Sequence, residues 1–333
     1  MSNEKFVEPA ILARRVAEQH GVDLSKLPKI LDMSAESITP NVPCYQRELC
    51  ASRRPDERLK FIFKNLVDHL HDFVRETSIT TEEWMTAIQF LTATGKMCSD
   101  IQFILLSDVV GVSTLVDTLN NVKPPNATET TVLGPFHTED AKDLENGATI
   151  ASEGKGDYMF VTGKVMDTKG NPIAGAVLDA WETDETGLYD TQYSDRDGPD
   201  CRGKVTSAAD GSYSFRAVIP IPYAIPSDGP VGKLIERLGR HVFRPAHLHF
   251  KIEAPGYEKL VTALYFKGDP YITSDTVFGV RTSLIVETET ITDTSLTLAR
   301  GFQRAEPHAE LKQDLFWRLR GSARRRGREP CPL

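Results

Sequence analysis

The sequence contains little cysteine and no long apolar segment. Its five cysteines are Cys44, Cys50, Cys98, Cys201 and Cys331. This odd number, without paired metal-ligand spacing, predicts reduced thiols rather than a disulfide framework or a zinc site. No apolar run approaches the roughly 20 residues that a membrane helix needs, and residues 1–6 lack the apolar stretch of a secretory signal. We therefore expect a cytoplasmic protein without membrane insertion.

A broad basic surface is also lacking, because the net charge is -8 and the charges are spread along the chain. This balance argues against nucleic acid as a partner. The exception is the C-terminal end, where residues 318–333 contain six arginines, from Arg318 to Arg328, and a single acidic residue, Glu329. We expect residues 306–333 to be a disordered basic tail.

The first third of the chain has helical patterning. Residues 53–75 carry apolar side chains at spacings of three and four, the pattern of an amphipathic helix. Thr80 and Glu83 can form a capping box at the start of a second helix, and residues 100–119 continue in helical style. A chain of 333 residues exceeds the usual size of one core, so we expect residues 1–125 to form a separate helical and linker domain.

Short strands dominate beyond Pro124 and Pro125, which interrupt the helical pattern. Strands are expected at residues 161–165, 177–182, 204–206, 213–217, 247–252 and 260–266. Asp210 and Gly211 favour a hairpin between the third and fourth of these. Many short strands with polar turns predict a β-sandwich, antiparallel or mixed, at residues 126–305. The expected fold class is α+β.

Four side chains are candidates for a metal site. His247 and His249 are two apart on an expected strand and can present two imidazoles to one ion, although such a pair can also be only hydrogen-bonded on a sheet face. Tyr189 ends the stretch from Trp181, and Tyr223 lies among three prolines. Each tyrosine alone could equally be a packing residue.

The ordered combination of these motifs resembles the intradiol ring-cleaving dioxygenases, in the hydroxyquinol and catechol 1,2-dioxygenase branch. The resemblance covers roughly residues 20 to 290. It is carried by Gly-Leu-Tyr at 187–189 after Trp-Glu at 181–182, Pro-Tyr-Ala-Ile-Pro at 222–226, Asp-Gly-Pro at 228–230, Gly-Arg-His at 239–241, and Arg-Pro-Ala-His-Leu-His at 244–249.

The resemblance implies Fe(3+) held by Tyr189, Tyr223, His247 and His249. Two phenolates and a hydroxide would neutralise this hard trivalent cation. Arg244 matches the family's active-site arginine, which stabilises negative charge developing on the substrate ring. Tyr223 is expected to leave the metal as substrate binds and to act as a base. The implied partners are a small aromatic diol or triol, O2, a second subunit joined through the N-terminal helices, and a lipid between the subunits.

The resemblance also suggests a substrate pocket. Its candidate residues are Leu105, Asp108, Val132, Gly134, Pro135, Phe136, Ile225, Pro226, Arg244 and Val277. These match the hydroxyquinol branch, which opens hydroxyquinol (1,2,4-trihydroxybenzene) to 3-hydroxy-cis,cis-muconate or maleylacetate. Asp108 is unusual on an apolar helix, and a third substrate hydroxyl could be its partner, although a solvent-facing or capping aspartate is the alternative. Ala263 stands where catechol-specific relatives commonly have glutamine.

Three alternatives remain open at this point. A catechol 1,2-dioxygenase would give cis,cis-muconate instead. A metal-free β-sandwich binding module is possible because this architecture supports many unrelated roles. A zinc hydrolase using His247 and His249 would lack a clear third protein ligand.

Overall fold

The computed structural model describes residues 14, 16–19, 25, 34–35, 38–39, 57–97 and 101–318. Cys201 is a free, buried thiol, whereas the other four cysteines and the arginines beyond Arg318 lie outside the described residues. In the described part, the chain divides into two compact units between Ile88 and Gln89. The second unit therefore begins before the expected boundary at residue 125.

The expected helices are present. They are α2 (Glu57–Thr77), α3 (Thr81–Lys96), α4 (Ile101–Val109) and α5 (Val112–Asn120). The structure adds two helices that the sequence did not predict, α6 (Pro230–Arg237) and α7 (Thr294–Ala299). The capping box is confirmed, because the Glu83 amide donates to Thr80 Oγ1 at 3.2 Å and the Thr80 amide donates to Glu83 Oε2 at 2.9 Å. The helical stretch from residue 100 breaks at Gly111, whose φ of 76° is left-handed.

None of the helices in the described ranges is by itself long and apolar enough to cross a membrane. The stretches Gln102–Val109 and Val112–Asn120 reach that length and composition only as a pair, and the pair is bent by 77°.

Two sheets form most of the second unit. The six-stranded sheet has the order β1-β4-β3-β8-β9-β10, and β2 pairs with β5, β12 and β13 in the other sheet, where β11 extends β12. The strands of the first sheet are β1 (Asp143–Leu144), β3 (Val177–Trp181), β4 (Arg202–Thr206), β8 (His247–Glu253), β9 (Leu260–Phe266) and β10 (Ile285–Val286). Those of the second are β2 (Tyr158–Asp167), β5 (Ser212–Val218), β11 (Glu289–Ile291), β12 (His308–Lys312) and β13 (Leu315–Trp317). A small separate pair joins β6 (Tyr223–Ala224) to β7 (Phe243–Arg244).

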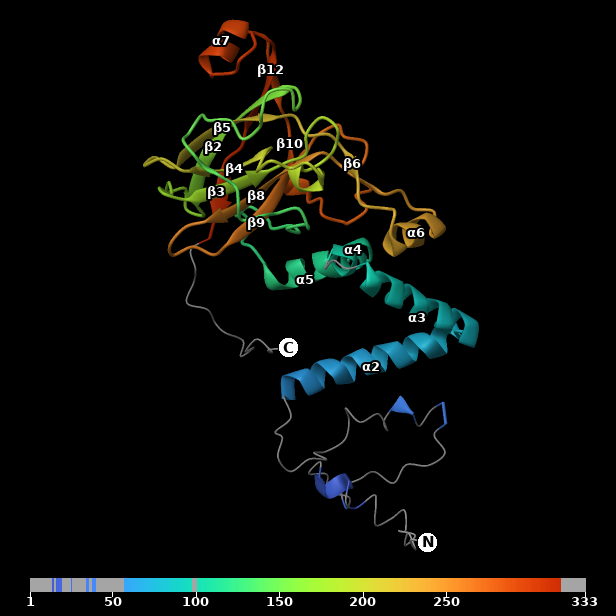
Figure 1. Cartoon of the computed structure of the whole chain (residues 1–333). Helices are drawn as coiled ribbons and strands as arrows, with labels where there is room; N and C mark the ends of the chain where they lie inside the picture. Colours follow the sequence, from blue (N-terminus) through green and yellow to red (C-terminus); the bar gives the residue numbers. More distant parts are fainter. Residues whose placement is uncertain are drawn as a thin grey trace, which may run out of the picture. The chain divides into compact units, whose positions relative to one another are not determined.

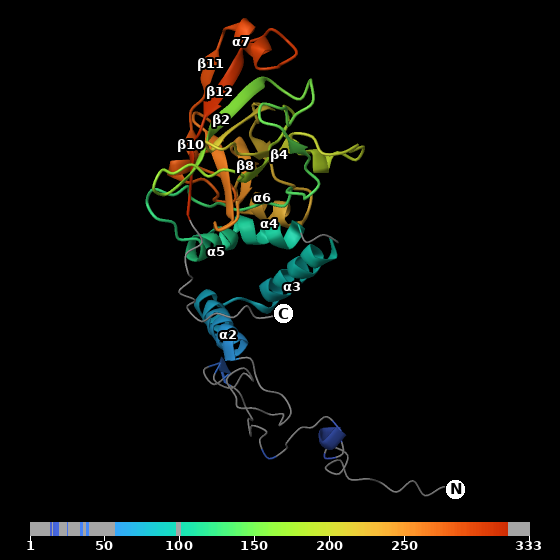
Figure 2. The same ribbon diagram turned by 90° about the vertical axis from the view of Figure 1, so that its left-hand side faces the viewer.

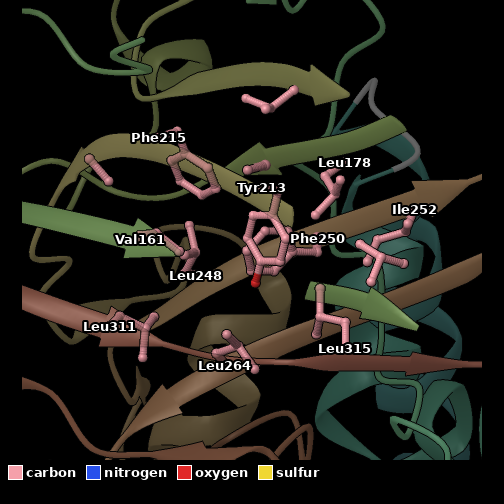
Figure 3. Close-up of a cluster of buried hydrophobic side chains, with 14 of the residues drawn as sticks. Val161, Leu178, Tyr213, Phe215, Leu248, Phe250, Ile252, Leu264, Leu311 and Leu315 are labelled. Carbon is pink, nitrogen blue, oxygen red and sulfur yellow. The ribbon is translucent and has the colours of Figure 1, made fainter. Parts of the chain in front are cut away.

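The main hydrophobic core lies between these sheets. Figure 3 shows Leu248 and Phe250 of β8 among side chains of the other sheet, such as Phe215 and Leu311. All four side chains are fully buried. The expected fold class is confirmed: helices precede a mixed β-sandwich.

Two expectations about the sheets are wrong. Asp210 and Gly211 do form a turn, but β4 and β5 on either side of it belong to different sheets, so no hairpin forms. The expected disordered tail from residue 306 is also wrong for its first part, because β12 and β13 pair in parallel with β2 and bury Leu311 and Trp317. Apolar burial there outweighs the polar character of the neighbouring sequence.

The strand period decides where the site lies. Leu248 and Phe250 point into the core between the sheets, so His247 and His249 point to the outer face of the six-stranded sheet. A second buried apolar cluster on this side includes Leu105 of α4 and Ile235 of α6. Figures 1 and 2 show α4 and α5 beside one end of the sheets and α7 at the opposite end.

Candidate active site

The four predicted metal ligands lie together beneath the surface. The Tyr189 hydroxyl is 3.2 Å from His247 Nε2, which is 3.0 Å from His249 Nε2. The ring centroids of Tyr189 and Tyr223 are 5.4 Å apart with their planes perpendicular. All four side chains are buried. The structure thus brings together two phenols and two imidazoles from three separate segments.

The imidazoles are prepared to accept a metal rather than a proton. His247 Nδ1 lies 2.7 Å from the Pro245 carbonyl oxygen, to which it can only donate, so the lone pair is on Nε2. Burial, together with the nearby Arg244 guanidinium, lowers the pKa of His247 to about 3. Burial likewise lowers the pKa of His249 well below its usual range. Both rings are therefore neutral at physiological pH.

The buried Tyr189 phenol needs a nearby cation to ionise. Burial first, and then the neighbouring Tyr223, raise the pKa of Tyr189 well above its ordinary value. A bound metal ion would be the largest local charge and would reverse this preference. The donor set therefore fits a hard, highly charged ion that binds phenolate and imidazole.

Local backbone features place the two tyrosines. Gly187 has a φ of 78°, and a Cβ there would lie 3.2 Å from the Cβ of Tyr223. A side chain at this position would strain the backbone and crowd the contact between the two segments. Tyr223 on β6 is paired with Arg244 on β7. The Gly-Leu-Tyr motif thus allows the Tyr189 segment to approach Tyr223 closely.

Arg244 lies inside the site, 3% exposed. Its Nη1 is 3.4 Å from the Tyr223 hydroxyl and 3.2 Å from His247 Nε2. Its other nitrogens contact Asp275 and Tyr265, which our sequence reasoning did not assign to the site. Asp275 lies two residues before Val277, a predicted pocket residue, and this proximity in the sequence was the available signal.

The apolar pocket residues also gather here. Leu105, Val132, Phe136, Ile225 and Val277 belong to one buried cluster with both tyrosines. Phe136 stacks on Tyr189, with ring centroids 4.6 Å apart.

The remaining small pocket residues adjoin this cluster. A Cβ on Gly134 would be 3.9 Å from His249 Nε2, and the φ of Gly134 is 73°. Pro135 and Pro226 are half-buried and adjoin Phe136 and Ile225 in the chain.

Asp108 is 5% exposed, which excludes the solvent-facing alternative. It lines a cavity of about 720 Å³ together with Val132 and Gly134. Burial raises the pKa of Asp108, while a hydrogen bond from Ser113 and the charge of Arg244 act in the opposite direction. The carboxyl group therefore lies within electrostatic reach of the active-site arginine.

The side chain of Ala263 is fully buried directly opposite His249 on the neighbouring strand. His249 Nδ1 is buried, and the described residues give it at most a weak bond to the Thr262 backbone. Its ring is instead held mainly by stacking on Trp181. Sequence reasoning did not foresee this role for the tryptophan.

A second group of possible ligand atoms lies near by, from His137, Glu139 and Asp179, all within 4.8 Å of one another. His137 Nε2 contacts Asp179 at 2.9 Å, and the Lys251 ammonium contacts Glu139 at 2.7 Å. Because Lys251 already supplies the positive charge, this group does not compete with the tyrosine and histidine set as the metal centre.

Known proteins are similar to this chain over most of its length. Residues 132–314 match the family model described as Dioxygenase, and residues 56–128 match that of the catechol dioxygenase N terminus. An intradiol ring-cleavage dioxygenase of Aspergillus niger is 50% identical over 291 residues, which cover 87% of this chain and 86% of that protein. A 6-chlorohydroxyquinol 1,2-dioxygenase of Cupriavidus pinatubonensis is 51% identical over 69% of this chain and 84% of its own.

A solved structure is similar over most of the chain. The hydroxyquinol 1,2-dioxygenase of Pseudomonas putida DLL-E4 superposes with a TM-score of 0.74 and is 44% identical, covering 80% of this chain and 93% of that one.

Proposed function

Because this chain belongs to the intradiol ring-cleavage dioxygenase family, we propose that its substrate is hydroxyquinol, which O2 converts to 3-hydroxy-cis,cis-muconate or its tautomer maleylacetate. The observation that carries the proposal is Asp108, a buried carboxyl group in the cavity beside the site. Relatives named for hydroxyquinol cleavage, at 44–51% identity, support it, whereas a catechol 1,2-dioxygenase of Candida albicans is 36% identical.

The proposed cofactor is Fe(3+), held by Tyr189, Tyr223, His247 and His249. The fit rests on the two buried phenols and on the Nε2 lone pair of His247, which its bond to Pro245 leaves free. When bound, the ferric ion would activate the bound diol toward O2.

The chain's own residues have distinct tasks in this proposal. The Tyr223 oxygen accepts a proton from a substrate hydroxyl, and Arg244 Nη1, 3.4 Å away, stabilises negative charge at that place. Phe136 and Val277 shape an apolar pocket that excludes water. Asp108 accepts a hydrogen bond from the third hydroxyl, which catechol lacks.

Oxygen uptake tests the substrate. Purified, iron-loaded protein is supplied with hydroxyquinol and catechol in parallel, and kcat/KM is measured for each. We expect hydroxyquinol to be preferred by at least about tenfold, since an unmatched buried carboxyl group costs roughly 1 to 3 kcal/mol. A preference for catechol would replace the proposal with the catechol 1,2-dioxygenase alternative. No uptake with either would reject both.

We also propose a homodimer through the N-terminal helices, with a lipid bound between the subunits. The apolar stripe of α2 supports it, since Phe63, Leu66 and Leu70 are 47%, 48% and 51% exposed in the single chain. Sedimentation of Leu66→Lys tests the dimer, with Asp72→Lys on the opposite face as control. We expect only the first to give monomers. Organic extraction and mass spectrometry test the lipid. The cytoplasmic location stays a prediction.

A further inference from the structure

The Arg244 guanidinium pairs with the buried carboxylate of Asp275. Its Nε lies 3.1 Å from Asp275 Oδ1 and its Nη2 lies 3.2 Å from Asp275 Oδ2, the two-point geometry of an arginine and carboxylate pair. Both side chains are at most 4% exposed. This leaves Nη1 to face Tyr223 and His247. We propose that Asp275 is the positioning residue that aims Arg244 at the reacting substrate, an inference that rests on the proposed function.

Asp275 is itself fixed by its own segment. The amide of Val277 donates to Oδ1 at 3.2 Å, and the amide of Gly279 donates to Oδ2 at 2.9 Å. Each carboxylate oxygen therefore accepts one backbone bond and one arginine bond. Because a turn of the chain holds the carboxylate, its direction does not depend on a flexible side chain.

The same segment is tied to the walls of the substrate pocket. Thr114 of α5 donates to the Val277 carbonyl at 3.1 Å, and Thr131 donates to the Gly279 carbonyl at 2.8 Å. Val277 belongs to the apolar pocket cluster. The residue that shapes the pocket and the residue that orients the arginine are thus two positions apart in one braced turn.

Gly279 keeps space for the arginine. A Cβ at this position would lie 2.8 Å from Arg244 Nη2, 2.8 Å from the Tyr265 hydroxyl and 3.1 Å from Asp275 Oδ2. Even one methyl group would displace the guanidinium without any change of charge. Gly279→Ala is therefore a second way to misdirect Arg244, one that crowds the guanidinium and Asp275 but keeps both charges.

The test is a double-mutant cycle on the iron-loaded protein with hydroxyquinol as the probe. Asp275→Asn, Arg244→Ala and the double variant are compared by kcat, by KM and by the visible absorption of the ferric-tyrosinate centre. We expect Asp275→Asn to lower kcat by on the order of a hundredfold, as misplacement of a catalytic group does, while the absorption band remains. In the Arg244→Ala background the same change should lower kcat less than about twofold, because the residue acts through Arg244.

A matched control separates positioning from stability. Glu310 on β12 pairs with Arg300, the residue after α7, in a partly buried pair away from the site. Glu310→Gln should lower the melting temperature without lowering kcat. If Asp275→Asn is too unstable to purify, Gly279→Ala should give the same loss of kcat with the band retained.

Three outcomes would overturn the proposal. The first is that Asp275→Asn lowers kcat by the same factor in the Arg244→Ala background as in the wild type, and the second is that Asp275→Asn loses both the iron and the visible absorption band. The third is that kcat is unchanged in both Asp275→Asn and Gly279→Ala. Failure of the proposed function is distinguishable, because wild-type protein would then prefer catechol or consume no O2 with either substrate. Urea unfolding of the metal-free variants would in that case still measure the Arg244 and Asp275 coupling, and additive changes there would reject the pairing itself.

Discussion

Trp181 lies flat against the imidazole of His249, with ring centroids 4.7 Å apart and an angle of 7° between their planes. The two residues are direct partners on β3 and β8. His137 packs edge-on against the tryptophan at 4.8 Å. The described residues give His249 Nδ1 at most a weak bond to the Thr262 backbone, so stacking on Trp181 does most to orient this ring.

Trp181→Leu should therefore weaken metal binding. Loss of a group that orients a ligand typically costs about 10- to 100-fold in metal affinity. Iron affinity can be measured by competition with a chelator. Trp317→Leu is the matched control, because Trp317 is equally buried but belongs to the core between the sheets. Equal loss of iron affinity in both variants would contradict a specific role for Trp181.

Tyr189→Phe should weaken and shift the visible absorption of the iron-loaded protein, since Tyr223 remains as the second phenolate. The phenyl ring keeps the stacking on Phe136 but removes the phenolate oxygen. Tyr213→Phe serves as the control, since Tyr213 is also buried but donates to the Gln313 carbonyl in the other sheet. An absorption spectrum of Tyr189→Phe that matches the wild type would remove Tyr189 from the ligand set.

Asp108→Ala should harm cleavage of hydroxyquinol more than that of catechol. The expected difference in kcat/KM is about tenfold to a hundredfold, which corresponds to a lost hydrogen bond of roughly 1 to 3 kcal/mol. Oxygen uptake with both substrates measures it. An equal decrease in kcat/KM for the two substrates would show that Asp108 does not bind the third hydroxyl.

The buried carboxyl group of Glu182 should make the stability of the protein depend on pH. Burial raises its pKa well above the ordinary value, and the amide of Val218, which donates to Oε1 at 3.0 Å, only partly opposes this. With a folded pKa above the unfolded one, the stabilising contribution is complete below about pH 4.5 and is lost as the pH rises toward the folded pKa.

Glu182→Gln should remove this dependence. Measured by urea unfolding of the metal-free protein between pH 4 and pH 8, the free energy of unfolding of the wild type should fall relative to the variant as the pH rises. Asp210, whose pKa is lowered to about 2, changes the free energy of unfolding with pH in the opposite direction. This contribution is the same in the wild type and the variant, so it cancels when the two free energies are subtracted. A constant difference across this pH range would mean that Glu182 is not the responsible group.

The sequence by itself determined the fold class, most elements and the candidate ligands. Periodicity indicated α2 and the alternation in β8, because both depend on neighbours within one element. The ordered motifs around Tyr189, Tyr223 and His247 indicated the site, since metal chemistry requires those side chains.

Only the tertiary structure decided which segments meet. The turn at Asp210 looked like a hairpin, yet strand pairing with β2 took β5 into the other sheet. The stretch before Arg318 looked like a tail, but burial of Trp317 made it a strand. The pairing of Arg244 with Asp275, 31 residues apart, and the stacking of Trp181 on His249 likewise follow from long-range packing, which local sequence does not encode.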